Sequence, residues 1–127
     1  MPQLSQITVL ASDARAASFE SDDFTNTNGA AGVLFLLDIT DATGTTPTLN
    51  INVQYKDPIS GSYVDIPNAA FAEHTAVASD SLLVYPSATA VADRQASSHI
   101  GGVWRMKAVI AGGGPSFTFS LAGYYLP

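Results

Sequence analysis

One eight-residue segment constrains the fold more than any other part of this chain. In residues 49–56 apolar and polar side chains alternate strictly, the apolar ones being Leu49, Ile51, Val53 and Tyr55. Alternation with period two is typical of a β-strand that buries one of its faces. Residues 57–61 then supply a proline, which presets φ for a turn, and a glycine, which accepts a positive φ. With the strand-like segment 62–66 behind them, they predict a β-hairpin with a loop of about four to five residues.

Short segments of the same kind recur along most of the chain. In residues 103–110 the side chains of Trp104, Met106, Ala108 and Ile110 fall on one side of a strand. Residues 14–19 are rich in alanine and ambiguous, and a strand is favoured there. Glycine, proline and asparagine mark loops at 25–29, 41–47 and 87–102, and they predict a hairpin turn at 111–115. The other strands are expected at 7–11, 33–40, 69–73, 81–85 and 116–121, the last extended by the tail 124–127.

Seven to nine short strands without a helical period predict an all-β fold. We expect a single-domain antiparallel β-sandwich, jelly-roll-like, over residues 1–127; a small barrel or a Greek key is the alternative. No internal repeat or domain boundary is evident. Residues 1–6 could serve as a flexible N-terminal arm.

The composition excludes several classes of function. Lys and Arg number 5 against 11 Asp and Glu, so the net charge is −6, which argues against nucleic acid and against a polybasic membrane contact. The absence of cysteine excludes disulfides and thiolate chemistry. The N-terminal sequence has no signal-peptide pattern, and the longest apolar stretch, 30–37, is far shorter than a membrane span. We therefore expect a protein made in the cytoplasm.

No motif in the sequence assembles a catalytic or metal site. His74 and His99 are 25 positions apart, and a zinc or proton-transfer role would need a third convergent group. The acidic clusters 20–23 and 38–41 could offer oxygens to Ca²⁺, but neither follows the spacing of a calcium loop, and solvated turn carboxylates are the simpler interpretation. Residues 112–116 lack the lysine of a phosphate-binding loop. We expect no enzyme, no metal and no cofactor.

Several apolar residues fall out of phase with the expected core. They suggest a second buried surface, which an oligomer would provide; cover by the chain's own loops is the alternative. Arg105 and Lys107 share the outer face of one strand and are expected to pair with nearby acids or, in an oligomer, with a neighbour's acidic loop. The candidate oligomer or capsid interface comprises Leu34, Leu36, Leu83, Arg105, Lys107, Tyr124 and Leu126.

The order of these features resembles small structural proteins encoded among the head and tail genes of tailed bacteriophages. The segments that carry the resemblance are 45–54, 56–58, 60–63, 84–86, 104–105 and 114–120. The resemblance implies a β-sandwich virion component with no catalytic residues. Its best-known role at this size is a capsid decoration or cement protein, often trimeric, and a head–tail or tail location is also compatible with it. The implied partners are further copies of the chain and the major capsid protein, on the outside of the virion.

A second hypothesis belongs to a different class of function. Trp104 is expected in the core, but together with Tyr63 or Tyr85 it could instead form a stacking platform for a sugar ring. The chain would then be a carbohydrate- or host-binding β-sandwich module.

Overall fold

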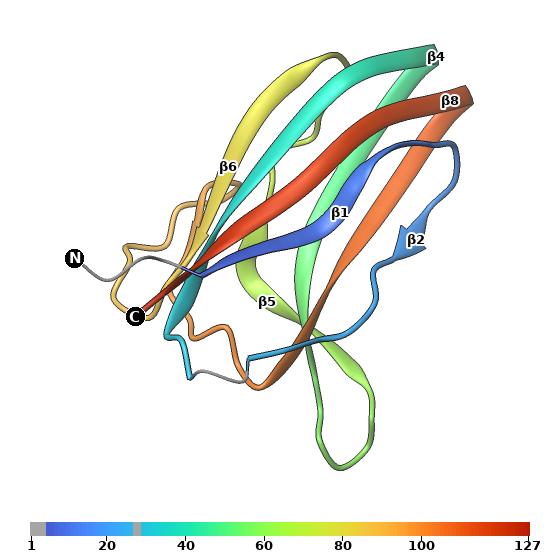
Figure 1. The fold of residues 1–127 in the computed structure, drawn as a ribbon. Coiled ribbons are helices and arrows are strands. Elements are labelled where there is room, and N and C mark those ends of the chain that lie inside the picture. The colour runs from blue at the N-terminus through green and yellow to red at the C-terminus, as the bar shows by residue number, and fades with distance from the viewer. Residues whose placement is uncertain (1–4, 27–28) are drawn as a thin grey trace.

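The computed structural model describes residues 5–26 and 29–127, in which it has strands and no helix (Figure 1). The all-β expectation is therefore confirmed. Two of the strands are much longer than the short strands expected, and the others have ten residues or fewer. The eight strands are β1 (Gln6–Arg15), β2 (Phe19–Glu20), β3 (Phe24–Thr25), β4 (Gly32–Lys56), β5 (Tyr63–Ala70), β6 (Ala78–Val84), β7 (Gln95–Ala96) and β8 (Val103–Leu126).

All eight strands belong to one open sheet. Its main path is β1-β8-β4-β6-β7, while β2 and β3 pair with β8 and β5 pairs with β4. Every pair is antiparallel except β6 with β7, which is parallel. The sheet is thus mixed. The expectation of a purely antiparallel sheet is wrong at the β7 end of the main path, where β7 follows a long connection and runs parallel to β6.

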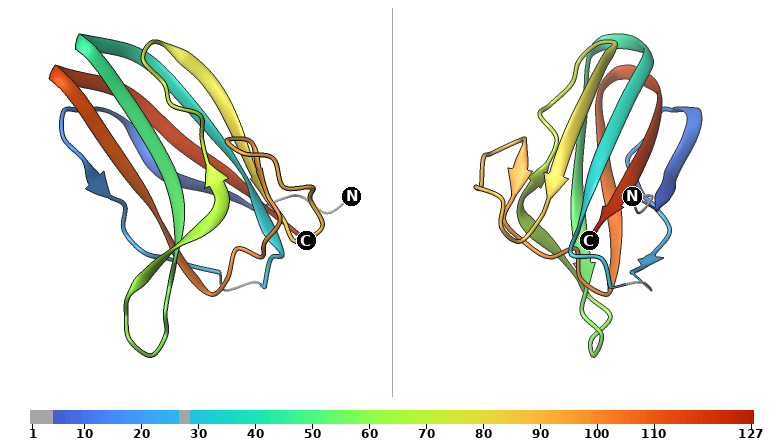
Figure 2. Two further views of the ribbon diagram at one scale, coloured as in Figure 1. Left: turned by 180° about the vertical axis from the view of Figure 1, so that it is seen from behind. Right: turned by 60° about the vertical axis from the view of Figure 1, so that its left-hand side comes forward.

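Strands β4 and β8 form the spine of the molecule. They are 25 and 24 residues long and pair from Gly32 opposite Leu126 to Tyr55 opposite Trp104. Each strand bends sharply near its middle while it stays paired with the other strand. The two halves of the sheet therefore face each other (Figure 2). Residues 41–47 are therefore part of β4 and not the expected loop. Residues 111–115 likewise bend β8 and are not a hairpin turn, since both flanking segments pair with β4.

The two bends share the pattern Gly-x-x-Pro and lie side by side, with Thr45 paired with Gly113. Gly44 and Gly112 both have a φ of 120°, a conformation that favours glycine. A Cβ on Gly44 would lie 2.9 Å from the Gly114 carbonyl oxygen, and one on Gly112 would lie 2.8 Å from the Thr46 carbonyl oxygen. Each glycine thus makes room for the backbone of the opposite bend. We call residues 44–47 and 112–115 the two corners.

The core lies between the two halves of the sheet. On both sides of the corners, every second residue of β4 and β8 contributes to it, as alternation requires. The predicted face of the 103–110 segment is confirmed, because Trp104, Met106, Ala108 and Ile110 are all buried. The buried residues of both halves form one cluster, whose largest fully buried members are Trp104, Phe35, Phe117 and Phe119.

Three smaller expectations change. The separate strands expected at 62–66 and 69–73 are joined, because β5 runs on to Ala70. The connection 87–102, expected to be a polar loop, contains the short strand β7 and also buries Ile100. Of the expected arm, residues 1–4 lie outside the described residues, and Gln6 already belongs to β1.

Candidate interaction surface

Apolar side chains gather on the outer side of one half of the sheet. Because alternate residues of β4 point into the core, Leu34 and Leu36 point outward. Leu34 lies opposite Leu83 of β6 and Tyr124 of β8, and cross-strand partners share one side of a sheet. The structure thus brings together five of the seven residues of the candidate interface. With one neighbour they form the apolar outer face: Leu34, Leu36, Leu83, Ala122, Tyr124 and Leu126.

The apolar outer face remains partly open to solvent. Leu36 is 40% exposed, and Leu34, Leu83, Tyr124 and Leu126 are half-buried. None of its six members carries a formal charge at neutral pH. Covering a face of this kind with another apolar surface is favourable, because it removes apolar area from water.

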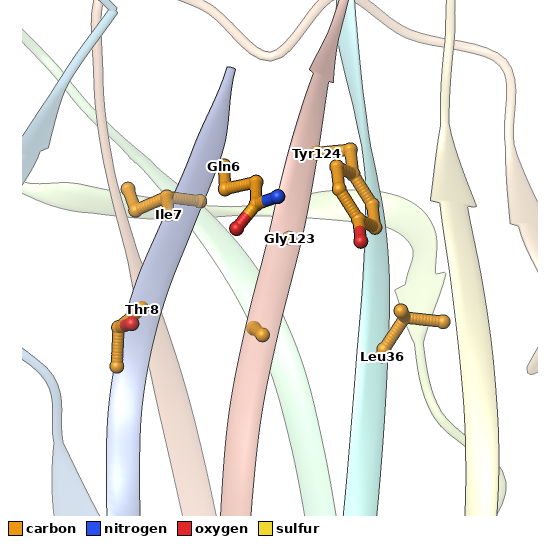
Figure 3. Close-up of a pocket in the computed structure, with 7 residues that line it drawn as sticks. Gln6, Ile7, Thr8, Leu36, Gly123 and Tyr124 are labelled. Carbon is orange, nitrogen blue, oxygen red and sulfur yellow. The ribbon is translucent and has the colours of Figure 1, made fainter. Parts of the chain in front are cut away.

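A hollow of about 340 Å³ opens beside this face, at its border with β1 (Figure 3). Ala122 lies in register between Thr8 of β1 and Leu36 of β4, so a small side chain separates two larger ones. We call the space the Ala122 hollow. It is lined by Gln6, Ile7, Thr8, Leu36, Ala122, Gly123 and Tyr124.

The remaining two candidate residues lie on the other half of the sheet. Arg105 is opposite Gln54 of β4, and Lys107 is opposite Asn52 of β4 and Glu20 of β2. Both lie on the outward face of the second half, away from the apolar outer face. The seven candidates therefore form two separate surfaces.

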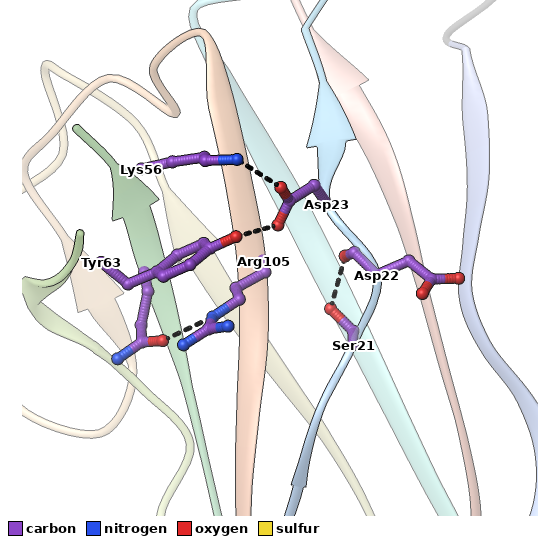
Figure 4. Close-up of polar contacts among 7 residues, drawn as sticks. Ser21, Asp22, Asp23, Lys56, Tyr63 and Arg105 are labelled. Atoms are coloured by element: carbon purple, nitrogen blue, oxygen red, sulfur yellow. Dashed lines mark hydrogen bonds and ion pairs between the residues drawn. The ribbon is translucent and has the colours of Figure 1, made fainter. Parts of the chain in front are cut away.

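Arg105 belongs to a polar network on this second face (Figure 4). Its guanidinium carbon lies 3.3 Å from the centre of the Tyr63 ring, and its Nε donates to the Gln54 side-chain oxygen at 2.9 Å. The Tyr63 hydroxyl donates to the Asp23 carboxylate at 2.7 Å, and Lys56 donates to the same carboxylate at 3.2 Å. The network attaches the segment between β2 and β3 to β4, β5 and β8. We call it the Tyr63 network.

Acid should loosen the Tyr63 network. The hydrogen bond from Tyr63, together with Lys56, lowers the pKa of Asp23 below its ordinary value of 3.8. A carboxyl group whose pKa is lower in the folded state stabilises the fold above its ordinary pKa, and this contribution is lost as the pH falls through the folded-state value. We therefore expect urea unfolding midpoints to decline below about pH 4 for the wild type, and to decline less for Asp23→Asn.

Asp22→Asn is the control for that titration, because it removes the same charge one residue away and its carboxylate points away from the network in Figure 4. It should keep the wild-type acid profile. Identical profiles for Asp23→Asn and the wild type would contradict the role given to this carboxylate.

The aromatic residues of the sugar-binding hypothesis are all engaged within the chain. Trp104 is fully buried and stacks on Phe24 with ring centres 4.7 Å apart. The Tyr63 ring lies between Lys56 and Arg105 in the view of Figure 4. The Tyr85 hydroxyl donates to the carbonyl oxygen of Pro127 at 2.8 Å. Trp104 therefore has no surface to offer to a sugar ring.

The two histidines lie in different surroundings. His74 is half-buried, and its Nε2 lies 2.8 Å from the Asp80 carboxylate, a pairing that the sequence analysis missed. His99 is exposed. Residues 5–26 and 29–127 contain no group of three or more His, Asp or Glu side chains arranged to hold a metal ion, and this includes the two acidic clusters. Within the same residues, no helix is long and apolar enough to cross a membrane.

Ile59 is a surface feature that the sequence analysis also missed. It lies at the end of the β4–β5 hairpin and is 96% exposed. An isoleucine between Pro58 and Ser60, in a turn of otherwise polar and small residues, is the signal that could have revealed it.

No protein-family model and no curated protein matches this chain.

Proposed function

We propose that this protein is a structural component of a bacteriophage virion, and more specifically a head decoration protein that binds the outer capsid surface as a homotrimer and stabilises the shell. The observation that carries the structural role is the apolar outer face, a charge-free and partly exposed surface on a β-sheet. The phage assignment rests on the resemblance of the hairpin and strand-end segments.

We assign the folded-over sheet to the jelly-roll-like β-sandwiches. The two facing halves and the single core between them support this assignment. Long paired strands give such a protein a rigid body, which a cement protein needs in order to span neighbouring capsid subunits. Binding to the assembled shell alone would then stabilise that shell by mass action.

The proposed trimer places three copies of the apolar outer face around one axis. Each copy carries a net charge of −6, so copies repel one another in general and must meet where charge is lowest. The apolar outer face meets that condition. The Tyr63 network lies on the opposite side and is left to face the capsid or solvent. We propose no enzymatic activity, metal or cofactor for this protein.

Light scattering on a size-exclusion column, followed by sedimentation with capsids assembled without the protein, tests the proposal. The wild type should have a mass of about 40 kDa, three times its 13.2 kDa, and should sediment with the capsids. Leu36→Lys should give a monomer with weaker capsid binding, because an ammonium group would have to be buried in the interface.

Val109→Lys is the matched control. Val109 is 41% exposed, nearly the same as Leu36, but lies on the other half of the sheet. It should behave as the wild type does. If the protein does not sediment with capsids but binds a glycan array, the virion proposal is overturned in favour of the carbohydrate- or host-binding module.

A further inference from the structure

The hairpin between β4 and β5 projects well beyond the body of the molecule (Figure 1). Its end, residues 57–62, is the hairpin tip. Ile59 at this tip is 96% exposed, while the next most exposed large apolar side chain, Val77, is 62% exposed. A four-carbon side chain held this far from its own core can be buried only by another surface.

The hairpin tip is held in one shape by its own hydrogen bonds. The Asp57 carboxylate accepts from the backbone N–H groups of Ile59 at 2.8 Å and Ser60 at 3.2 Å. The Gly61 N–H donates to the Asp57 carbonyl oxygen at 2.9 Å. The bonds from Ile59 and Ser60 engage the Asp57 carboxylate within the tip and lower its pKa. A tip ordered in advance loses less conformational entropy when it binds.

The Ala122 hollow, at about 340 Å³, is large enough to receive such a side chain. It is open to solvent, and its lining combines apolar groups with the polar side chains of Gln6 and Thr8. No Asp, Glu, Lys or Arg side chain lines it. It also adjoins the proposed interface, because Leu36, Ala122 and Tyr124 belong to both.

We propose that Ile59 of one copy inserts into the Ala122 hollow of the next copy. This inference rests on the proposed self-association and specifies its geometry. The tip and the hollow are different surfaces, so the contact is head-to-tail, and a head-to-tail contact forms a ring when its rotation closes. A ring of three copies would leave no tip and no hollow unfilled. Every copy carries both an exposed Ile59 and an Ala122 hollow, so a second copy offers a partner to each of these surfaces.

Mixing two variants, each of which lacks one side of the contact, tests this geometry. Ile59→Asp removes the inserted side chain and keeps the hollow; Ala122→Glu fills the hollow and keeps Ile59. Each variant alone should be a 13.2 kDa monomer, while an equal mixture should form a species of about 26 kDa, twice that mass, because only one intact contact exists per pair. An interface built from the same patch on both copies would not be restored by mixing.

Val77→Asp is the control, since it places the same charge at an exposed apolar site away from both surfaces. It should leave the wild-type mass unchanged. Circular dichroism should show that all the variants remain folded.

The outcomes separate this inference from the proposed function. If Ile59→Asp keeps the wild-type mass while Leu36→Lys is monomeric, the apolar outer face mediates association and insertion of Ile59 is wrong. A wild type that is monomeric at every concentration overturns the insertion and the preformed trimer, while capsid sedimentation still decides the virion role. Two monomeric variants that stay monomeric on mixing also overturn the head-to-tail contact.

Discussion

Replacing Trp104 with alanine is expected to lower the free energy of unfolding by about 3–5 kcal/mol, the range found when large aromatic side chains are deleted from a core. Trp104 is fully buried and has the largest side chain in the core. It stacks on Phe24 at 4.7 Å and meets Phe35 edge-on at 5.4 Å between ring centres. Through these contacts it joins β3, β4 and β8, so its loss would open a cavity where three strands meet.

Urea unfolding followed by circular dichroism measures this loss, since the variant has no tryptophan left for fluorescence. Trp104→Phe should cost less, because it keeps an aromatic ring between Phe24 and Phe35. A Trp104→Ala protein within about 1 kcal/mol of the wild type would be far below the expected range for a core aromatic. It would show that Trp104 does not occupy the position described.

The inward and outward faces of the strands could be predicted from sequence, because they depend on local alternation. Residues 49–53 and 117–121 bury the side chains that their period indicates. Period two separates the inward face of a strand from its outward face. It does not say on which of the two halves of the folded sheet that outward face lies. For that reason Leu34 and Arg105 were expected on one interface, whereas they lie on opposite halves of the sheet.

The corners could not be predicted, because they depend on pairing between distant residues. Glycine and proline at 44–47 and 112–115 indicate a change of direction, and a loop and a hairpin turn were expected there. Whether a chain reverses by pairing with itself or by bending along another strand is decided by that other strand. Here Thr45 pairs with Gly113, a residue 68 positions away. The shared Gly-x-x-Pro pattern was visible in the sequence but had no meaning without this register.

Replacing Gly112 with alanine is expected to lower the free energy of unfolding by about 2–6 kcal/mol. A φ of 120° places any L side chain in strained backbone, which costs on the order of 1–3 kcal/mol. The added Cβ would also lie 2.8 Å from the Thr46 carbonyl oxygen and 2.9 Å from the Pro47 Cα. Both are backbone atoms that cannot turn away, and overpacking of this kind adds about 1–3 kcal/mol. Urea unfolding at neutral pH measures the effect.

Gly102→Ala is the matched control, because no atom lies within 4 Å of its added Cβ and its φ is not positive. It should change the free energy of unfolding by no more than about 0.5 kcal/mol. Gly44→Ala should resemble Gly112→Ala, since its Cβ would meet Gly114 and Pro115 in the same way. The double variant should cost less than the two single losses added together, because the first substitution already separates the two neighbouring corners. Strictly additive losses would mean that the two corners deform independently of each other.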